Sequence, residues 1–102
     1  MNPVCMSEAQ LQSKVLQYLA SQPDVWAIKV VSANQRGVPD IIGCWSGQFF
    51  ALEVKSLTGR ASKIQTAQMD AIDAAGGVTR IVTPLTDLST LGPWIQKAIS
   101  GL

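Results

Sequence analysis

Three stretches of the chain repeat apolar residues at helical spacing. In residues 7–21 the apolar stripe consists of Leu11, Val15, Tyr18 and Leu19, and "SEAQ" at the start of this segment is a capping-box pattern with Ser7 as the N-cap. A second helix is predicted from "SKIQ" at Ser62 to the glycine pair at residues 76–77. Its apolar stripe consists of Ile64, Ala67, Ala71, Ile72 and Ala75. A last helix is expected to begin at Pro93, after a short turn capped by Asp87.

Four stretches have the β-branched and aromatic character of strands. They are residues 25–31, 39–45, 48–55 and 78–82, and Ser46-Gly47 predicts a hairpin turn between the second and third. The order is therefore α-β-β-β-α-β-α. A helix between the third and fourth strands allows a parallel crossover, so we expect an α/β fold with a mixed four-stranded sheet flanked by helices. Residues 1–102 are expected to form a single domain.

Three charged residues stand in the otherwise apolar hairpin. On the third strand, alternation of side chains places Glu53 and Lys55 on the same face. If the hairpin pairs around Ser46-Gly47, Asp40 lies opposite this end of the strand. Two carboxylates and an ammonium group then converge, and carboxylates placed together repel unless a positive charge lies between them.

A hard divalent cation would stabilise this arrangement. Magnesium takes oxygen ligands and is commonly held by one or two carboxylates plus substrate phosphate. Asp40 and Glu53 are the expected ligands, and the backbone carbonyl of Val54 is a further candidate. The cation would activate a water for attack on phosphorus, while Lys55 orients that water or stabilises charge on the phosphate. The pattern predicts phosphodiester hydrolysis.

Composition narrows the alternatives. The chain contains no histidine, which excludes Ser-His and Cys-His catalysis and His-ligated zinc. Its two cysteines form no CxxC pattern, as is typical of a protein of the reducing cytoplasm. There is no secretory leader and no apolar run of about 20 residues, so we expect a protein of the cytoplasm, without membrane contact.

The motif and its surroundings resemble a known family. "GVPD", twelve further residues and then "EVK" resemble the PD-(D/E)XK nuclease signature, and the whole chain is similar to the small stand-alone VRR-Nuc domains of phages and bacteria. The resemblance extends over the helix bearing Glu8, "GVPDIIG", "ALEVKS", the polar loop before "IQTAQ", and "GGVTRIV". One departure is that "VTRIV" has a single arginine where two are expected.

This resemblance implies a restriction-endonuclease-like core and a nuclease that depends on Mg²⁺ or Mn²⁺. It implies that Asp40, Glu53 and Lys55 carry the catalytic motif, that Glu8 helps to hold a metal, and that Gln65 faces the active site. Stand-alone members are implied to be homodimers that cut branched DNA such as Holliday junctions. The expected location is then the cytoplasm of a bacterium or of a phage-infected host cell.

Several of these residues also have structural interpretations. Glu53 and Lys55 could form a surface ion pair, which is worth only about 0–1 kcal/mol, and Asp40 could be a turn residue. Glu8 in a first helical turn complements the helix dipole. Gln65 completes a capping box, and we expect this role and an active-site role to exclude each other, with the resemblance favouring the active site.

Basic residues near the motif are candidates for contact with nucleic acid. Arg36, Arg60 and Lys63 lie in or beside the two polar loops, where phosphate contact and a solvated loop are both plausible. A DNA-binding module with a nuclease-like fold but no cleavage is the alternative function. The intact motif favours the enzyme, because a binding module would be free to lose these three residues. A cleavage assay with Mg²⁺ or Mn²⁺ separates the two functions.

Overall fold

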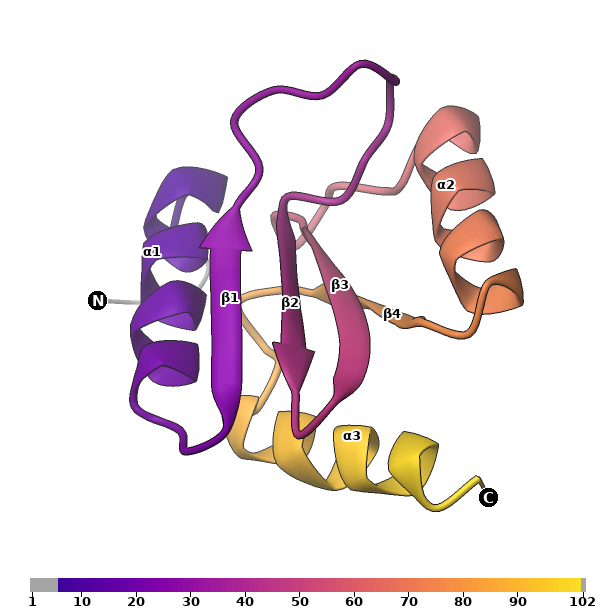
Figure 1. Cartoon of the computed structure of the whole chain (residues 1–102). Helices are drawn as coiled ribbons and strands as arrows, with labels where there is room; N and C mark the ends of the chain where they lie inside the picture. The colour runs from indigo at the N-terminus through magenta and orange to yellow at the C-terminus, as the bar shows by residue number, and fades with distance from the viewer. Residues whose placement is uncertain (1–5, 102) are drawn as a thin grey trace.

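A computed structural model describes residues 6–101 as a four-stranded mixed sheet with three α-helices around it (Figure 1). The predicted order α-β-β-β-α-β-α is confirmed. Residues 1–5 and 102 of the expected domain lie outside the described residues. The helices are α1 (Glu8–Ala20), α2 (Lys63–Ala74) and α3 (Leu91–Ile99), and a 3₁₀ turn, η2 (Leu88–Thr90), precedes α3. The strands are β1 (Val25–Lys29), β2 (Ile41–Trp45), β3 (Gln48–Val54) and β4 (Val78–Val82).

The strands lie in the order β1-β2-β3-β4. The first three form an antiparallel meander, and β4 runs parallel to β3 after the crossover through α2. This is the mixed sheet predicted from the helix between the third and fourth strands. No helix within residues 6–101 has the length and apolar character needed to cross a membrane.

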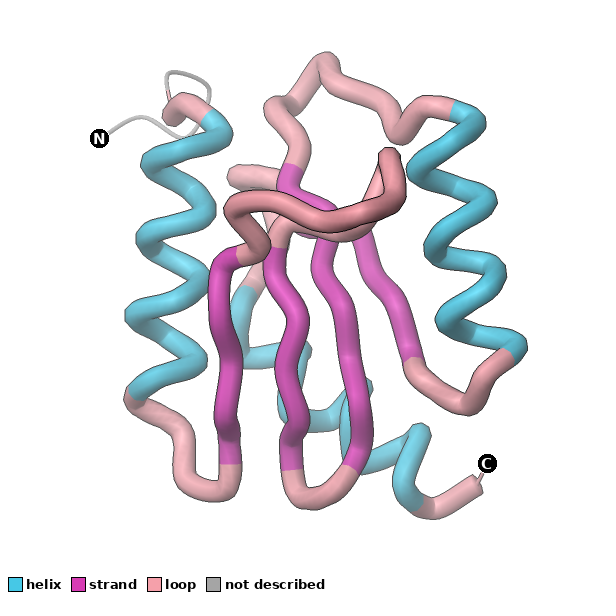
Figure 2. Tube along the Cα trace, turned by 45° about the horizontal axis from the view of Figure 1, so that its top comes forward, coloured by secondary structure: helices cyan, strands magenta, loops and turns pink. Residues whose placement is uncertain are grey.

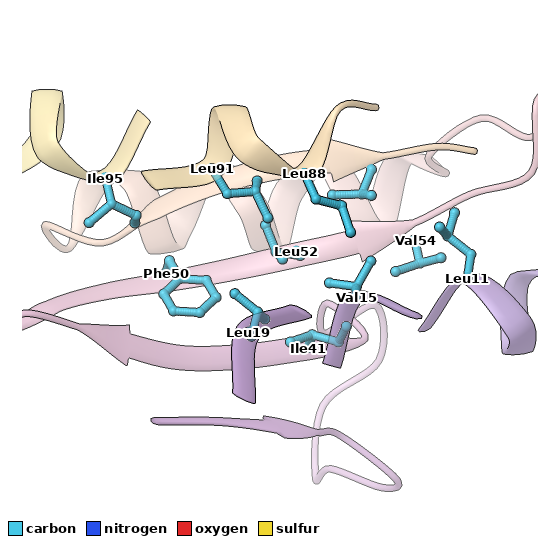
Figure 3. Close-up of a cluster of buried hydrophobic side chains, with 11 residues drawn as sticks. Leu11, Val15, Leu19, Ile41, Phe50, Leu52, Val54, Leu88, Leu91 and Ile95 are labelled. Carbon is cyan, nitrogen blue, oxygen red and sulfur yellow. The ribbon is translucent and has the colours of Figure 1, made fainter. Parts of the chain in front are cut away.

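The main core lies on one face of the sheet, under α1 and α3 (Figure 3). Phe50, Leu52 and Val54 point to this face from β3, because alternate side chains of a strand share a face. Helix α1 contributes Leu11, Val15 and Leu19, and the C-terminal segment contributes Leu88, Leu91 and Ile95. We call this side of the sheet the α1 face and the opposite side the α2 face.

The α2 face is only partly covered. Helix α2 contacts β4 but has no buried residue, so its predicted apolar stripe packs less closely than expected. Alanine side chains at positions 67, 71 and 75 are too short to reach far into the sheet, and they are exposed. The β1–β2 half of this face is open to solvent, and Trp26 on β1 is 60% exposed.

Local chain chemistry places most element ends within one residue of the prediction and shifts three of them by two residues. The strand expected to reach residue 31 ends at Lys29, although the Val30 amide still donates to the Asp40 carbonyl at 2.8 Å. Pro39 has no N–H to continue this ladder, so β2 begins at Ile41 rather than at residue 39. Helix α3 begins two residues before Pro93, which is tolerated because amides of the first turn have no partner within the helix.

Caps and turns follow the sequence prediction. Both capping boxes are formed, by Ser7 with Gln10 and by Ser62 with Gln65, and the Asp87 side chain caps η2. Ser46-Gly47 is a two-residue hairpin turn with positive φ at both positions, the conformation that suits the right-handed twist of paired strands. These local signals fix the register that brings the charged residues together.

The loop between β1 and β2 crosses the end of the sheet and is anchored on α2 (Figure 2). Gln68 Nε2 donates to the Arg36 carbonyl and to Gln35 Oε1, each at 3.0 Å. Gly37 has φ +80°, and a Cβ placed there would lie 2.2 Å from Ile64 Cγ2. The loop can approach the first turn of α2 so closely only because residue 37 has no side chain.

We expect Gly37→Ala to lower the free energy of unfolding by roughly 2–4 kcal/mol, because an unfavourable φ and a steric clash add. Urea unfolding at pH 7 measures this loss. The matched control is Gly47→Ala, where φ is +85° but no atom lies within 4 Å of the added Cβ. It should cost only about 1–2 kcal/mol. Equal losses in the two variants would mean that the loop is not held against α2.

Candidate active site

Asp40 and Glu53 lie opposite each other at the end of the β2–β3 hairpin. The last pair of the register joins Ile41 to Leu52, so the next positions outward are Asp40 and Glu53. Asp40 Oδ2 accepts a hydrogen bond from the Val54 amide at 2.8 Å, which fixes its carboxylate beside β3. The convergence predicted from the hairpin therefore occurs in the structure.

Glu53 is a carboxylate in an unfavourable environment. It is 1% exposed, and its Oε2 has no hydrogen-bond partner among residues 6–101. Burial is the main cause, and the neighbouring Asp40 carboxyl group the next, of a rise in the pKa of Glu53 from 4.5 to about 8. The opposing effect of Lys55 on this pKa is smaller than these combined effects. The site accordingly favours a proton or a cation at Glu53.

Lys55 lies directly beyond Glu53 on the same side of the chain. Its Nζ is 3.9 Å from Glu53 Oε1, and its side chain is 13% exposed. The ammonium group is thus sheltered rather than part of a freely solvated surface pair. A cation in this position can approach an anionic ligand while remaining close to the carboxylates.

Gln65 corrects the expectation that capping and active-site roles exclude each other. Its Oε1 accepts from the Ser62 amide at 2.8 Å and completes the capping box of α2. Its Nε2 donates to Glu53 Oε1 at 3.2 Å. The two ends of one amide therefore serve both roles at once, and the start of α2 is connected to the buried carboxylate.

We expect Gln65→Glu to lower the free energy of unfolding at pH 8 by about 2 kcal/mol in the presence of a chelator. A glutamate retains the cap acceptor but loses the donor to Glu53 and adds a second negative charge beside it. Gln10→Glu is the matched control, because Gln10 holds the equivalent place in the capping box of α1. Thermal or urea unfolding should show a change below about 0.5 kcal/mol for this control. Similar losses in both variants would show that the contact between Gln65 and Glu53 is not the cause of the loss.

The structure brings the other candidate metal ligands together less completely. Glu8 Oε2 accepts from the Ser56 amide at 3.3 Å, and its charge contributes to the raised pKa of Glu53. Nevertheless, the described part of the chain contains no group of three or more Asp, Glu, His or Cys side chains arranged to hold a metal ion. The side chain of Val54 points into the core, so only its carbonyl is available as a ligand. Metal binding by Glu8 and Val54 stays a prediction.

The three basic candidates separate into two groups. Arg36 and Lys63 line one pocket together with Gln65, although they lie on different polar segments of the chain. Arg60 is exposed on the loop before α2 and is not among the residues that line this pocket. Sequence analysis did not predict that the β1–β2 loop brings Arg36 to the start of α2. Two residues could have indicated this contact: Gly37, which has no side chain, and Gln68, which lies one helical turn after Gln65.

The fold has a counterpart among solved structures. A chain described as "VRR_NUC domain" superposes with a TM-score of 0.68 over 87% of this chain and 94% of that chain, at 15% sequence identity. This chain has the VRR_NUC fold. No protein-family model matches the sequence, and no curated protein matches it either.

The VRR_NUC fold confirms the nuclease-like core that the resemblance implied. In this fold the present chain places Asp40, Glu53 and Lys55 on the two central strands of the sheet or directly beside them. Glu53 extends from the α2 face, next to the first turn of α2, whereas the hydrophobic core fills the α1 face. The charged cluster is thus separated from the core by the sheet itself.

Proposed function

We propose that this protein is a metal-dependent DNA endonuclease of the VRR-Nuc family that hydrolyses phosphodiester bonds, with branched DNA as its substrate. The proposal is supported by the VRR_NUC fold and by the motif residues Asp40, Glu53 and Lys55, which the fold brings together. The fold and the three motif residues are independent observations, because a chain with this fold could lack these side chains.

The observation that carries the proposal is the buried carboxylate of Glu53. Its Oε2 has no donor within residues 6–101, and Asp40 beside it adds a second negative charge. Such a pair lowers stability when ionised, so a purely structural role gives no reason for it. A divalent cation would give both carboxylates a partner, which makes this the arrangement expected at a metal-dependent hydrolytic site.

The residues present fit Mg²⁺ or Mn²⁺. Asp40 and Glu53 supply carboxylate oxygens, and the Val54 carbonyl and Glu8 are the candidates for further ligands. Magnesium typically keeps several waters and needs few protein ligands, so two carboxylates are sufficient to hold it together with substrate phosphate. When bound, the metal would supply Lewis acidity toward the phosphate and its attacking water.

The protein's own groups then have separate roles. Asp40 is held by the Val54 amide, and Glu53 is oriented by Gln65 Nε2, so both carboxylates are positioned before the substrate arrives. The Lys55 ammonium group lies next to them and stabilises negative charge that develops on the phosphate. Through its hydrogen bond to Glu53 Oε1, Gln65 acts as a positioning residue for that carboxylate.

We extend the proposal to the assembly. A homodimer presents two active sites, as cleavage of two strands at a junction requires. The α2 face offers apolar surface for such a contact, in Trp26 and Ile28 on β1 and in Phe49 on β3. Analytical ultracentrifugation at micromolar protein should give twice the mass of the 10.9 kDa chain. A single-chain mass at all concentrations would remove the dimer from the proposal without affecting the chemistry.

A substrate comparison tests the function. The protein is incubated with a four-way junction, a flap, a duplex and single-stranded DNA, in Mg²⁺, Mn²⁺ or chelator. We expect metal-dependent cleavage that is strongest on the branched substrates, and no cleavage in chelator. Salt-sensitive binding without cleavage in either metal would support the DNA-binding module instead.

A further inference from the structure

A concave basic site lies beside the carboxylates but separate from them. A pocket of about 410 Å³ is lined by Arg36, Gly37, Ser62, Lys63, Ile64 and Gln65. Asp40, Glu53 and Lys55 are not among its lining residues, and Gln65 is the residue that touches both places, since its Nε2 donates to Glu53 Oε1. The pocket is therefore one side chain away from the candidate active site.

The two cations of this pocket have no acidic partner. Within residues 6–101 the structure has one ion pair, between Lys55 and Glu53, so neither Arg36 nor Lys63 pairs with an acid there. No carboxylate lines the pocket either. Two unpaired positive charges that converge from distant parts of the sequence create a local positive potential, which favours an anionic ligand.

The position of Arg36 is fixed by the fold rather than left to a free loop. Gln68 Nε2 holds the Arg36 carbonyl at 3.0 Å, and Gly37 lies against the backbone of Ile64. Figure 2 shows the β1–β2 loop reaching the start of α2. The two contacts hold the backbone of this loop in place, and Arg36 lines the same pocket as Lys63. Ile64 adds an apolar surface, 43% exposed, on the same pocket wall.

We infer that the pocket binds a DNA phosphate next to the one that is cleaved, with Arg36 and Lys63 as its contacts and the sugar against Ile64. This inference rests on the proposed nuclease function. A phosphate in the pocket is distinct from the reacting one in this proposal, because Asp40, Glu53 and Lys55 do not line the pocket. Binding the neighbouring phosphate positions the strand so that the next phosphodiester lies over the carboxylates.

DNA binding in chelator tests the pocket without any cleavage. Fluorescence anisotropy with a labelled duplex and a labelled four-way junction, over a range of NaCl concentrations, gives the salt dependence of affinity. The variant Arg36→Ala/Lys63→Ala should reduce the steepness of log K against log[salt] by about 1, because both residues contact the same phosphate and each neutralised phosphate contributes about 0.9. The charge-matched control Lys14→Ala/Lys97→Ala changes exposed lysines on α1 and α3 and should keep the wild-type slope.

Neutral methylphosphonate linkages, placed singly around the cleaved bond, then identify the contacted phosphate. One position should lower kcat/KM of the wild type about tenfold and have no additional effect on Arg36→Ala/Lys63→Ala. An unchanged salt slope in this variant, or a methylphosphonate effect that persists in it, would overturn the inference. If the wild type binds DNA but never cleaves it, the proposed function is wrong, and the salt slopes alone decide whether the pocket binds phosphate.

Discussion

Asp40→Asn lowers kcat/KM for DNA cleavage by about 10³-fold and leaves the fold intact, because it removes the charge and little else. Asp40 Oδ2 accepts the Val54 amide at 2.8 Å, and the carbonyl of an asparagine side chain can accept the same bond with the same volume. What is lost is one of the two carboxylates that hold the metal. Steady-state cleavage of a four-way junction in Mg²⁺ measures the effect, and urea unfolding reports on the fold.

Asp73→Asn is the matched control for this charge removal. The Asp73 carboxylate also accepts a hydrogen bond, from Thr79 Oγ1 at 3.0 Å, but it lies at the exposed end of α2 away from the motif. We expect its kcat/KM to remain within about twofold of the wild type, because no group of the site contacts it. Asp40→Asn with more than a tenth of wild-type activity would contradict a metal-holding role for Asp40.

In chelator, the free energy of unfolding should fall as pH rises, and Glu53 is the cause. Its pKa is 4.5 before burial and about 8 in the folded protein, so the folded state keeps a proton that the unfolded state releases within this window. The contribution of Glu53 to the free energy of unfolding is therefore fully present below about pH 4.5. This contribution is lost progressively as the pH rises to about 8. Between pH 5 and 8.5 the loss should be on the order of 4 kcal/mol.

Glu53→Gln should remove this pH dependence and be more stable than the wild type at pH 8.5, because the neutral amide avoids burial of a charge. The chain has no histidine, so few other groups titrate between pH 5 and 8. Urea unfolding at a series of pH values measures both proteins. Asp70→Asn is the control, because Asp70 is exposed on α2 and is not among the groups that raise the pKa of Glu53, so this variant should keep the wild-type slope. A slope of the same size in Glu53→Gln would place the titrating group elsewhere.

Metal should reverse the same effect. A cation that binds the ionised carboxylates stabilises only the folded state, so millimolar Mn²⁺ at pH 8 should raise the melting temperature of the wild type. Glu53→Gln should show no such increase. Because binding requires the deprotonated carboxylate, the apparent metal affinity should also increase with pH up to about 8.

Local signals in the sequence were sufficient for much of the fold and for the central cluster. The two capping boxes, the Ser46-Gly47 turn and the period-two pattern of residues 48–55 each depend on neighbouring residues only. Together they fix the hairpin register, and the register brings Asp40 to Glu53. The meeting of these two carboxylates was therefore predictable from the sequence.

Features that depend on packing between distant segments were not predictable in this way. The apolar stripe of α2 predicted a packed helix, but its alanines are too short to cover the β1–β2 half of the sheet. The double role of Gln65 depends on how closely α2 approaches β3, which no local pattern specifies. The position of Arg36 depends on the contact between Gly37 and Ile64 across the β1–β2 loop.

The claim on which the function depends is that Asp40 and Glu53 hold one cation together. Crystals of the protein soaked in Mn²⁺ at pH 8, with anomalous diffraction measured at the manganese edge, test it directly. We expect an anomalous peak within coordination distance of a carboxylate oxygen from each of these two residues. A peak that contacts only one of them, or no peak at this end of the hairpin, would contradict the account.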